Sequence, residues 1–136
     1  MSTTGGCLCG AVRYALARAP TDVWFCHCGQ CRKAQGSAFV ASVPVPRSDF
    51  TLLQGGASLK AFRSSAHKRR WFCGDCGSPL YSEVDGGETL RLRAGSLDEP
   101  TTLRPAGHIF VADKAPWEAL HDDLPKFAAR EPGRPG

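Results

Sequence analysis

The chain has 136 residues, a length typical of one domain, and contains 15 glycines, 10 prolines and 7 cysteines. Its formal net charge of +4 largely disappears if the cysteines bind zinc as thiolates, so composition gives no case for a nucleic-acid partner. No apolar run approaches the roughly 20 residues that cross a bilayer, and residues 1–6 lack the pattern of a secretory signal. We therefore expect a soluble cytoplasmic protein with no membrane partner, in a reducing compartment that keeps thiols free.

Short apolar segments between glycine and proline turns predict β-strands along most of the chain. The first expected strand carries Val12 and Tyr14 on one face. Further strands are expected over 22–25, 38–43, 50–53, 59–62, 67–72, 79–84, 89–93 and 108–111. Residues 29–35 are good helix formers followed by Gly36, so they predict one short helix. A single helical turn is expected over 117–120.

Turn residues also predict how some strands pair. Gly55-Gly56 indicates a hairpin between 50–53 and 59–62, and residues 85–87 indicate a second one between 79–84 and 89–93. We expect Pro44 and Pro46 to end the strand over 38–43. Leucine and arginine alternate over 90–93, which predicts one buried face and one solvated face.

This pattern predicts a mainly β protein, built as a small antiparallel domain with zinc knuckles and one short helix. We assign the zinc-binding domain to residues 1–125. Residues 126–136 are rich in glycine, proline and charge, so they are expected to form a disordered tail.

The cysteines fall in three tight clusters, a C-x-C at 7–9, a C-x-C-x-x-C at 26–31 and a C-x-x-C at 73–76. Neighbouring thiolates can converge on one cation, whereas disulfide partners usually lie far apart in sequence and come in even numbers. The clusters therefore predict metal ligation, with zinc as the commonest metal in such sites. The alternative is that these thiols are reduced and buried without metal.

We expect the first and last clusters to form one closed tetrahedral site for a structural zinc ion, because each supplies two ligands from a tight turn. Its ligands are Cys7, Cys9, Cys73 and Cys76. The remaining trio is Cys26, Cys28 and Cys31. Three sulfurs leave one corner of the tetrahedron free, so the trio predicts a catalytic zinc ion and a total of two zinc ions per chain.

Two other arrangements stay open. His67 or His108 could be the fourth ligand of a closed Cys₃His site. Alternatively, the last two cysteines of the trio could group with the C-x-x-C.

An open site with three thiolates is a weak Lewis acid but attracts sulfur, so it suits a thiol substrate better than water. A thiol that enters the free corner loses its proton there. Formation or cleavage of a carbon–sulfur bond is therefore the chemistry that we expect of the trio, with a small thiol as partner.

Five blocks of the chain resemble, in order, the glutathione-dependent formaldehyde-activating enzyme family, a group that also contains centromere protein V. The blocks cover 6–14, 26–36, 72–80, 95–98 and 108–111. The resemblance implies a β-tent fold and the same division into a structural and a catalytic zinc site. It also implies carbon–sulfur lyase activity of the S-hydroxymethylglutathione synthase type, on small thiol–aldehyde adducts of glutathione and formaldehyde.

The alternative function is a non-enzymatic zinc module that binds protein or nucleic acid. A basic stretch, which comprises Arg63, His67, Lys68, Arg69 and Arg70, motivates it. We interpret this stretch as a solvated strand and loop. His27 and His108 are candidate proton carriers, although a histidine in an apolar strand such as His108 is more often structural.

Overall fold

The structure is a computed structural model that describes residues 3–99 and 102–134. Its strands are β1 (Thr3–Gly6), β2 (Arg13–Leu16), β3 (Asp22–Cys26), β4 (Val40–Pro46), β5 (Phe50–Gln54), β6 (Leu59–Arg63), β7 (Lys68–Cys73), β8 (Pro79–Val84), β9 (Thr89–Arg93) and β10 (Arg104–Ile109). The α-helix is α1 (Gly29–Gln35), and the 3-10 segments are η1 (Arg47–Asp49), η2 (Ala94–Ser96) and η3 (Val111–Asp113). None of the described helices is long and apolar enough to cross a bilayer.

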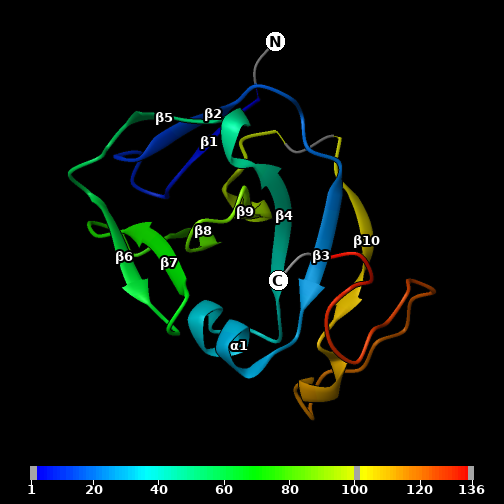
Figure 1. The fold of residues 1–136 in the computed structure, drawn as a ribbon. Coiled ribbons are helices and arrows are strands. Elements are labelled where there is room, and N and C mark those ends of the chain that lie inside the picture. The colour runs from blue at the N-terminus through cyan, green and yellow to red at the C-terminus, as the bar shows by residue number, and fades with distance from the viewer. Residues whose placement is uncertain (1–2, 100–101, 135–136) are drawn as a thin grey trace.

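The strands form two sheets. The smaller has the order β1-β2-β5, and the larger has the order β10-β3-β4-β9-β8-β7-β6. The larger sheet bends, so β6 and β7 stand on one side of the molecule and β3 and β10 on the other, with α1 at one end (Figure 1). This arrangement confirms the predicted mainly β, antiparallel class with one short α-helix. Among the named strands one pair, β10 with β3, is parallel.

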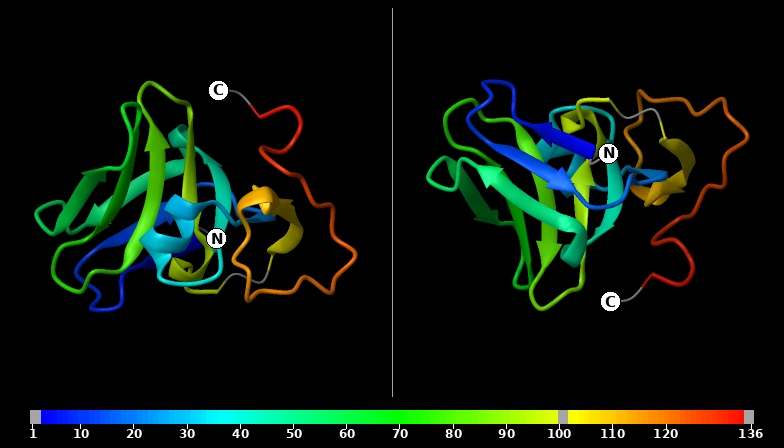
Figure 2. Two further views of the ribbon diagram at one scale, coloured as in Figure 1. Left: turned by 90° about the horizontal axis from the view of Figure 1, so that it is seen from below. Right: turned by 90° about the horizontal axis from the view of Figure 1, so that it is seen from above.

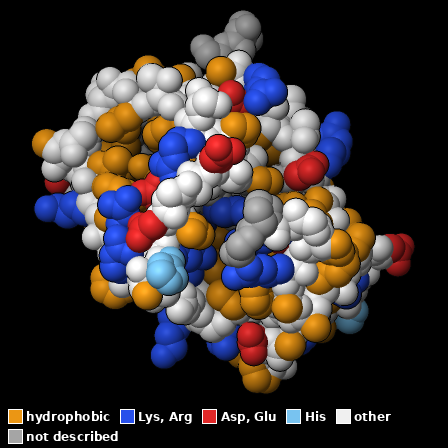
Figure 3. Space-filling view, viewed as in Figure 1, with side chains coloured by type: hydrophobic (Ala, Val, Ile, Leu, Met, Phe, Trp, Pro, Cys, Tyr) orange, Lys and Arg blue, Asp and Glu red, His pale blue; other side chains and the backbone are white. Residues whose placement is uncertain are grey.

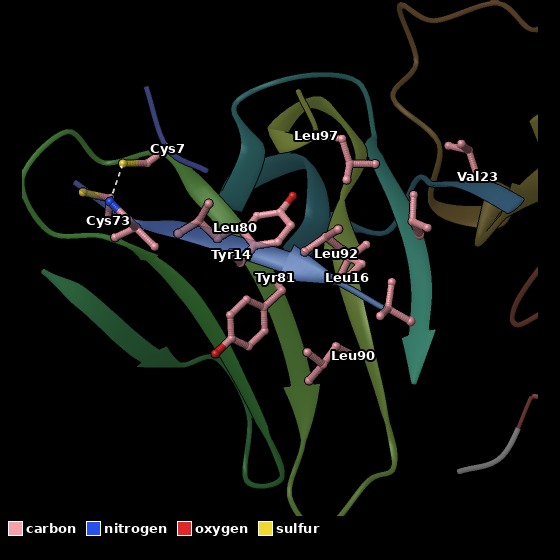
Figure 4. Packing of buried hydrophobic residues seen from close by; sticks show 13 residues of the cluster. Cys7, Tyr14, Leu16, Val23, Cys73, Leu80, Tyr81, Leu90, Leu92 and Leu97 are labelled. Atoms are coloured by element: carbon pink, nitrogen blue, oxygen red, sulfur yellow. Dashed lines mark hydrogen bonds between the residues drawn. The ribbon is translucent and has the colours of Figure 1, made fainter. Parts of the chain in front are cut away.

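The apolar core lies between the two sheets, and Figure 4 shows its side chains converging there. Tyr14 of β2 stacks on Phe50 of β5, and Phe50 contacts Tyr81 of β8. Leu90 and Leu92 of β9 are buried beneath them. The predicted inward face of β9 is therefore confirmed.

The predicted solvated face of β9 is wrong. Arg93 has only 6% of its surface exposed, and the Arg91 side chain has 16%. The reason is that the bent sheet and the C-terminal segment enclose the face of β9 that lies away from the core. A pattern of alternation cannot distinguish solvent from an enclosed polar space.

The hairpin predicted around Gly55-Gly56 is also wrong. β5 pairs with β2 in the small sheet, whereas β6 pairs with β7 in the large one. The turn therefore carries the chain from one sheet to the other. The second predicted hairpin, β8 with β9, is confirmed.

The glycine turn at the crossing between the sheets is tightly packed. Gly55 has a φ of +93°, and a Cβ at this position would lie 2.3 Å from the carbonyl oxygen of Ala11. We expect Gly55→Ala to lower the free energy of unfolding by about 3 kcal/mol, from backbone strain and the clash together. Gly86→Ala is the matched control, because Gly86 has a φ of +73° with nothing within 4 Å, and we expect a loss of about 1 kcal/mol. Urea unfolding measures both, and equal losses would contradict the packing argument.

Strand β4 continues through Pro44 to Pro46 instead of ending there. Its pairing with β3 covers Val40 to Ser42 only, so the later residues of β4 have an unpaired side. Proline, which cannot donate a hydrogen bond, is tolerated at such an edge.

The C-terminal part differs most from the sequence expectations. Residues 117–120 do not form a helical turn, and the nearby helical segment is η3. Within the segment expected to be disordered, residues 126–129 lie beside β10, and residues 130–134 continue away from it (Figure 2). The backbone N–H of Phe127 donates to the His108 carbonyl at 2.9 Å, and that of Phe110 donates to Ala129 at 2.9 Å. The expectation for 135–136 falls outside the described residues, and the domain boundary at 125 stays a prediction.

Candidate metal centres and active site

Four cysteines that lie far apart in sequence meet at one edge of the core. The sulfur atoms of Cys7, Cys9, Cys73 and Cys76 all lie within 4.8 Å of one another. The Sγ atoms of Cys7 and Cys9 are 3.6 Å apart, and those of Cys9 and Cys73 are 3.8 Å apart. This is the set that the spacing of the clusters predicted, and it could hold a metal ion.

The local backbone is arranged to stabilise thiolates in this group. The Val12 backbone N–H donates to the Cys7 sulfur at 3.2 Å. The Ser78 hydroxyl lies 3.2 Å from the Cys76 sulfur and, with the Ser78 backbone N–H, lowers the pKa of Cys76 to about 5. Deprotonated sulfurs are what a zinc ion requires, so the residues fit such an ion. The group also links the β1–β2 turn in the small sheet to the β7–β8 turn in the large one.

The second group consists of Cys26, Cys28 and Cys31, whose sulfur atoms also lie within 4.8 Å of one another. Cys26 ends β3, and Cys28 is the N-cap of α1, where its sulfur accepts a hydrogen bond from the Cys31 backbone N–H at 3.3 Å. Cys26 and Cys31 are buried, whereas Cys28 is only partly buried. The group could hold a metal ion and has one accessible side, at Cys28.

Within residues 3–99 and 102–134, no histidine nitrogen or carboxylate oxygen joins the three sulfurs of this group. The structure therefore gives no support to His67 or His108 as a fourth ligand. It also keeps the C-x-x-C apart from the trio, in the group with Cys7 and Cys9.

A buried arginine lies beside the trio. The two terminal nitrogens of Arg70, on β7, are 3.9 and 3.8 Å from the Cys31 sulfur, and one of them donates to the Gln30 side chain at 3.4 Å. Hydrogen bonds from Cys26 and Cys28, and then the charge of Arg70, hold the pKa of Cys31 well below its usual range. Hydrogen bonds with Cys28 and Cys31, and then burial, raise the pKa of Cys26. Arg70 thus lies where it stabilises negative charge on the Cys31 sulfur.

Only part of the basic stretch is the solvated surface that the sequence suggested, because Arg63 and His67 lie at the surface but Arg70 does not. Arg70 has 8% of its surface exposed. Arg63 and Arg69 remain partly exposed, but they pair with Asp85 and Glu83, each at 2.9 Å. These pairs neutralise two charges of the stretch, so the observation that motivated a nucleic-acid-binding module is weakened.

His27 and His108 form a buried pair behind the trio. Nε2 of His27 lies 2.8 Å from Nδ1 of His108, and Nε2 of His108 lies 2.8 Å from a carboxylate oxygen of Asp122. Hydrogen bonding to His108, and then to Lys126, lowers the pKa of Asp122 to about 2. The sequence named both histidines but missed Asp122, because no motif or predicted element marked its neighbourhood.

The pair also fixes the loop that carries the trio. The His27 backbone N–H donates to the Ile109 carbonyl at 3.0 Å, while its ring bonds to His108. This places the His27 ring toward β10 and tethers the backbone between Cys26 and Cys28. The structural interpretation of His108 agrees with this geometry.

Comparison with known proteins shows what the chain is similar to. Residues 2–113 match the family described as glutathione-dependent formaldehyde-activating enzyme. A crystal structure of a Rhodobacter sphaeroides protein has a similar fold, with a TM-score of 0.59 and 23% identity over 70% of this chain and 87% of that one.

Two curated fungal relatives are each named "Putative glutathione-dependent formaldehyde-activating enzyme". The relative from Sordaria macrospora is 30% identical over 82 residues, which are 60% of this chain and 35% of that protein. The relative from Podospora anserina is 30% identical over 81 residues, which are 58% of this chain and 38% of that protein. The matched stretch is thus little more than a third of each relative. Because the family match extends over most of the chain, the protein belongs to the glutathione-dependent formaldehyde-activating enzyme family.

Proposed function

We propose that the chain is a zinc-dependent carbon–sulfur lyase that acts on small thiol–aldehyde adducts. The proposed reaction is the formation or breakdown of S-hydroxymethylglutathione from glutathione and formaldehyde. The observation that carries the proposal is the group of three cysteine sulfurs that no fourth side chain joins within the described residues. The family match and the names of the fungal relatives support glutathione and formaldehyde as the reactants.

The two cysteine groups have different roles in this proposal. Cys7, Cys9, Cys73 and Cys76 would hold a structural zinc ion with all four positions filled. Cys26, Cys28 and Cys31 would hold the catalytic zinc ion. When bound there, zinc supplies a thiophilic coordination position at which a thiol loses its proton.

The residues around the trio prepare it for this chemistry. Arg70 faces Cys31 and stabilises negative charge on its sulfur, and the partly exposed Cys28 marks the side from which a substrate enters. The His27–His108 pair positions the loop between the ligands. In the forward reaction the thiol sulfur attacks the carbonyl carbon of formaldehyde, and the proton of the thiol ends on the aldehyde oxygen. No further reactant is needed.

Seven cysteines are free of disulfide bonds in the structure. Free thiols persist in reducing compartments, which supports the cytoplasm as the location of the protein.

The direct test uses the zinc-loaded protein with formaldehyde and glutathione, and follows S-hydroxymethylglutathione by NMR exchange spectroscopy. We expect faster exchange than in the uncatalysed mixture, loss of the excess rate after chelation, and its return when zinc is added back. An exchange rate equal to the uncatalysed rate with two zinc ions bound would reject the lyase proposal.

A further inference from the structure

Four basic side chains share one face of the large sheet, opposite the apolar core. They are Lys68 and Arg70 of β7 and Arg91 and Arg93 of β9. In the strand register Arg70 lies opposite Ser82 of β8, and Ser82 lies opposite Arg91. Cross-strand partners project from the same face of a sheet. The four side chains therefore form one basic row, and Arg70 places this row next to Cys31.

The basic row carries more positive charge than its surroundings neutralise. Arg70 and Arg93 are buried, Lys68 is partly buried, and among the described residues Arg91 alone of the four pairs with a carboxylate. Nε of Arg70 and Nε of Arg93 are buried without a hydrogen-bond partner in the described part of the chain. Burial, and then repulsion by Arg70, lowers the pKa of Lys68 and lowers that of Arg93 to about 10. A terminal nitrogen of Arg93, Nη1, donates to neutral groups, the Ser82 hydroxyl and the Arg91 carbonyl. Buried charges that no carboxylate balances are costly, so such a group indicates a site for an anion.

The cysteine trio accounts for only part of this excess. Three thiolates with one zinc ion carry a net charge near −1, and Arg70 already faces that charge through Cys31. The charge of the same trio, on Cys26 and Cys31, also acts on Lys68 and Arg93. No carboxylate among the residues that the structure describes pairs with either of these two cations.

The row borders open space. A cavity of about 460 Å³ is lined by Lys68, Ser82, Arg91 and Arg134, together with the β8–β9 turn and two acidic residues, Glu83 and Glu88. Glu83 is already paired with Arg47 and Arg69. A smaller hollow of about 190 Å³ reaches Arg70 and Arg93 from the side of α1. Basic side chains are visible deep in the hollow at the centre of Figure 3. The cations are therefore placed for a ligand to contact them.

A carboxylate of the protein already occupies the outer end of the row. Glu131, with 8% of its surface exposed, accepts hydrogen bonds from Arg91 at 3.2 Å and from Arg134 at 3.3 Å. It belongs to the C-terminal segment 126–134, of which residues 126–129 lie beside β10 through the backbone hydrogen bonds described above. The row thus binds a carboxylate in the structure itself.

We propose that Lys68, Arg91 and Arg93 form a carboxylate-binding site beside Cys31, and that Glu131 occupies its outer end until a carboxylate of the thiol substrate replaces it. The identity of the thiol as glutathione, which has two carboxylates, rests on the proposed function. The site would orient the substrate so that its sulfur reaches the trio, and it would favour anionic thiols over neutral ones.

The test measures binding without turnover. S-methylglutathione keeps both carboxylates, but its methyl group prevents formation of a thiolate. We expect isothermal titration calorimetry with the zinc-loaded protein to detect its binding. Lys68→Met should weaken this binding by about tenfold, because a charge-assisted hydrogen bond is lost. Arg18→Met, which removes a basic side chain that is 73% exposed and far from the row in sequence, should leave the affinity unchanged.

Glu131→Gln gives a second, opposite readout. It removes the internal carboxylate from Arg91, so we expect S-methylglutathione to bind several-fold more tightly than to the wild type. Unchanged affinity in both Lys68→Met and Glu131→Gln, with wild-type circular dichroism, would overturn the proposal. Inorganic phosphate that binds as tightly as S-methylglutathione would overturn the assignment to carboxylates.

Failure of the proposed function gives a different result. A protein that binds S-methylglutathione in a Lys68-dependent way but does not accelerate S-hydroxymethylglutathione exchange would retain the carboxylate site and reject the lyase. An active protein with no Lys68-dependent binding would retain the lyase and reject the site.

Discussion

Replacement of Cys28 by serine is expected to lower the rate of S-hydroxymethylglutathione exchange by more than about a hundredfold, while the chain keeps its fold. The sulfur of Cys28 has two roles in the structure. It is one of three atoms that could hold the catalytic metal, and it caps the first turn of α1 by accepting the Cys31 backbone N–H. Serine is a preferred N-cap residue, so it keeps the second role. It removes only the thiolate, and two remaining sulfurs bind zinc weakly.

Three measurements check this prediction: zinc content, far-UV circular dichroism and the exchange rate. We expect one zinc ion per chain instead of two, an unchanged spectrum and a rate close to the uncatalysed one. Lys33→Ala is the matched control, because it alters an exposed position on the same helix and leaves the trio intact. Wild-type exchange in Cys28→Ser would show that the trio does not hold the catalytic metal.

The cysteine groups could be predicted from sequence because their geometry is mainly local. A C-x-x-C places two sulfurs on one tight turn, and Gly77, with a φ of +78°, closes that turn after Cys76. The helix that carries Cys31 could be predicted for the same reason, since Gly36 ends it in the left-handed conformation with a φ of +69°. Such signals lie within a few residues of the structure that they specify.

Features that depend on distant partners could not be predicted in this way. Residues 50–54 and 59–63 have the pattern of a hairpin, but each strand has a better partner elsewhere, in β2 and β7. Arg91 and Arg93 alternate with leucines as surface residues do, and only the bend of the sheet shows that they face an enclosed space. Asp122 acquires its importance from His108, 14 residues earlier in the chain. In each case the relevant contact is between elements, and no local pattern specifies it.

Cys28→Ser should keep the fold, whereas Cys73→Ser should destabilise the whole protein. Cys73 is fully buried at the end of β7, and its sulfur lies 3.8 Å from that of Cys9, 64 residues earlier. A crosslink that closes a loop of this length stabilises a fold by about 4 kcal/mol, mainly through the unfolded chain. The new buried hydroxyl adds a penalty of about 1–3 kcal/mol. Because domains are stable by only about 5–15 kcal/mol in total, we expect a melting temperature lower by more than about 10 °C.

Cys9→Ser separates the two contributions. Cys9 is exposed, so its serine variant loses the crosslink without burying a hydroxyl, and it should be less destabilised than Cys73→Ser. Chelation of the wild type should reproduce the effect of Cys9→Ser.

The trio spans only six residues, so its metal closes a short loop and contributes less through the unfolded chain. Cys28→Ser should therefore lose activity at nearly wild-type stability, whereas equal destabilisation by Cys28→Ser and Cys73→Ser would remove the distinction between a structural and a catalytic site.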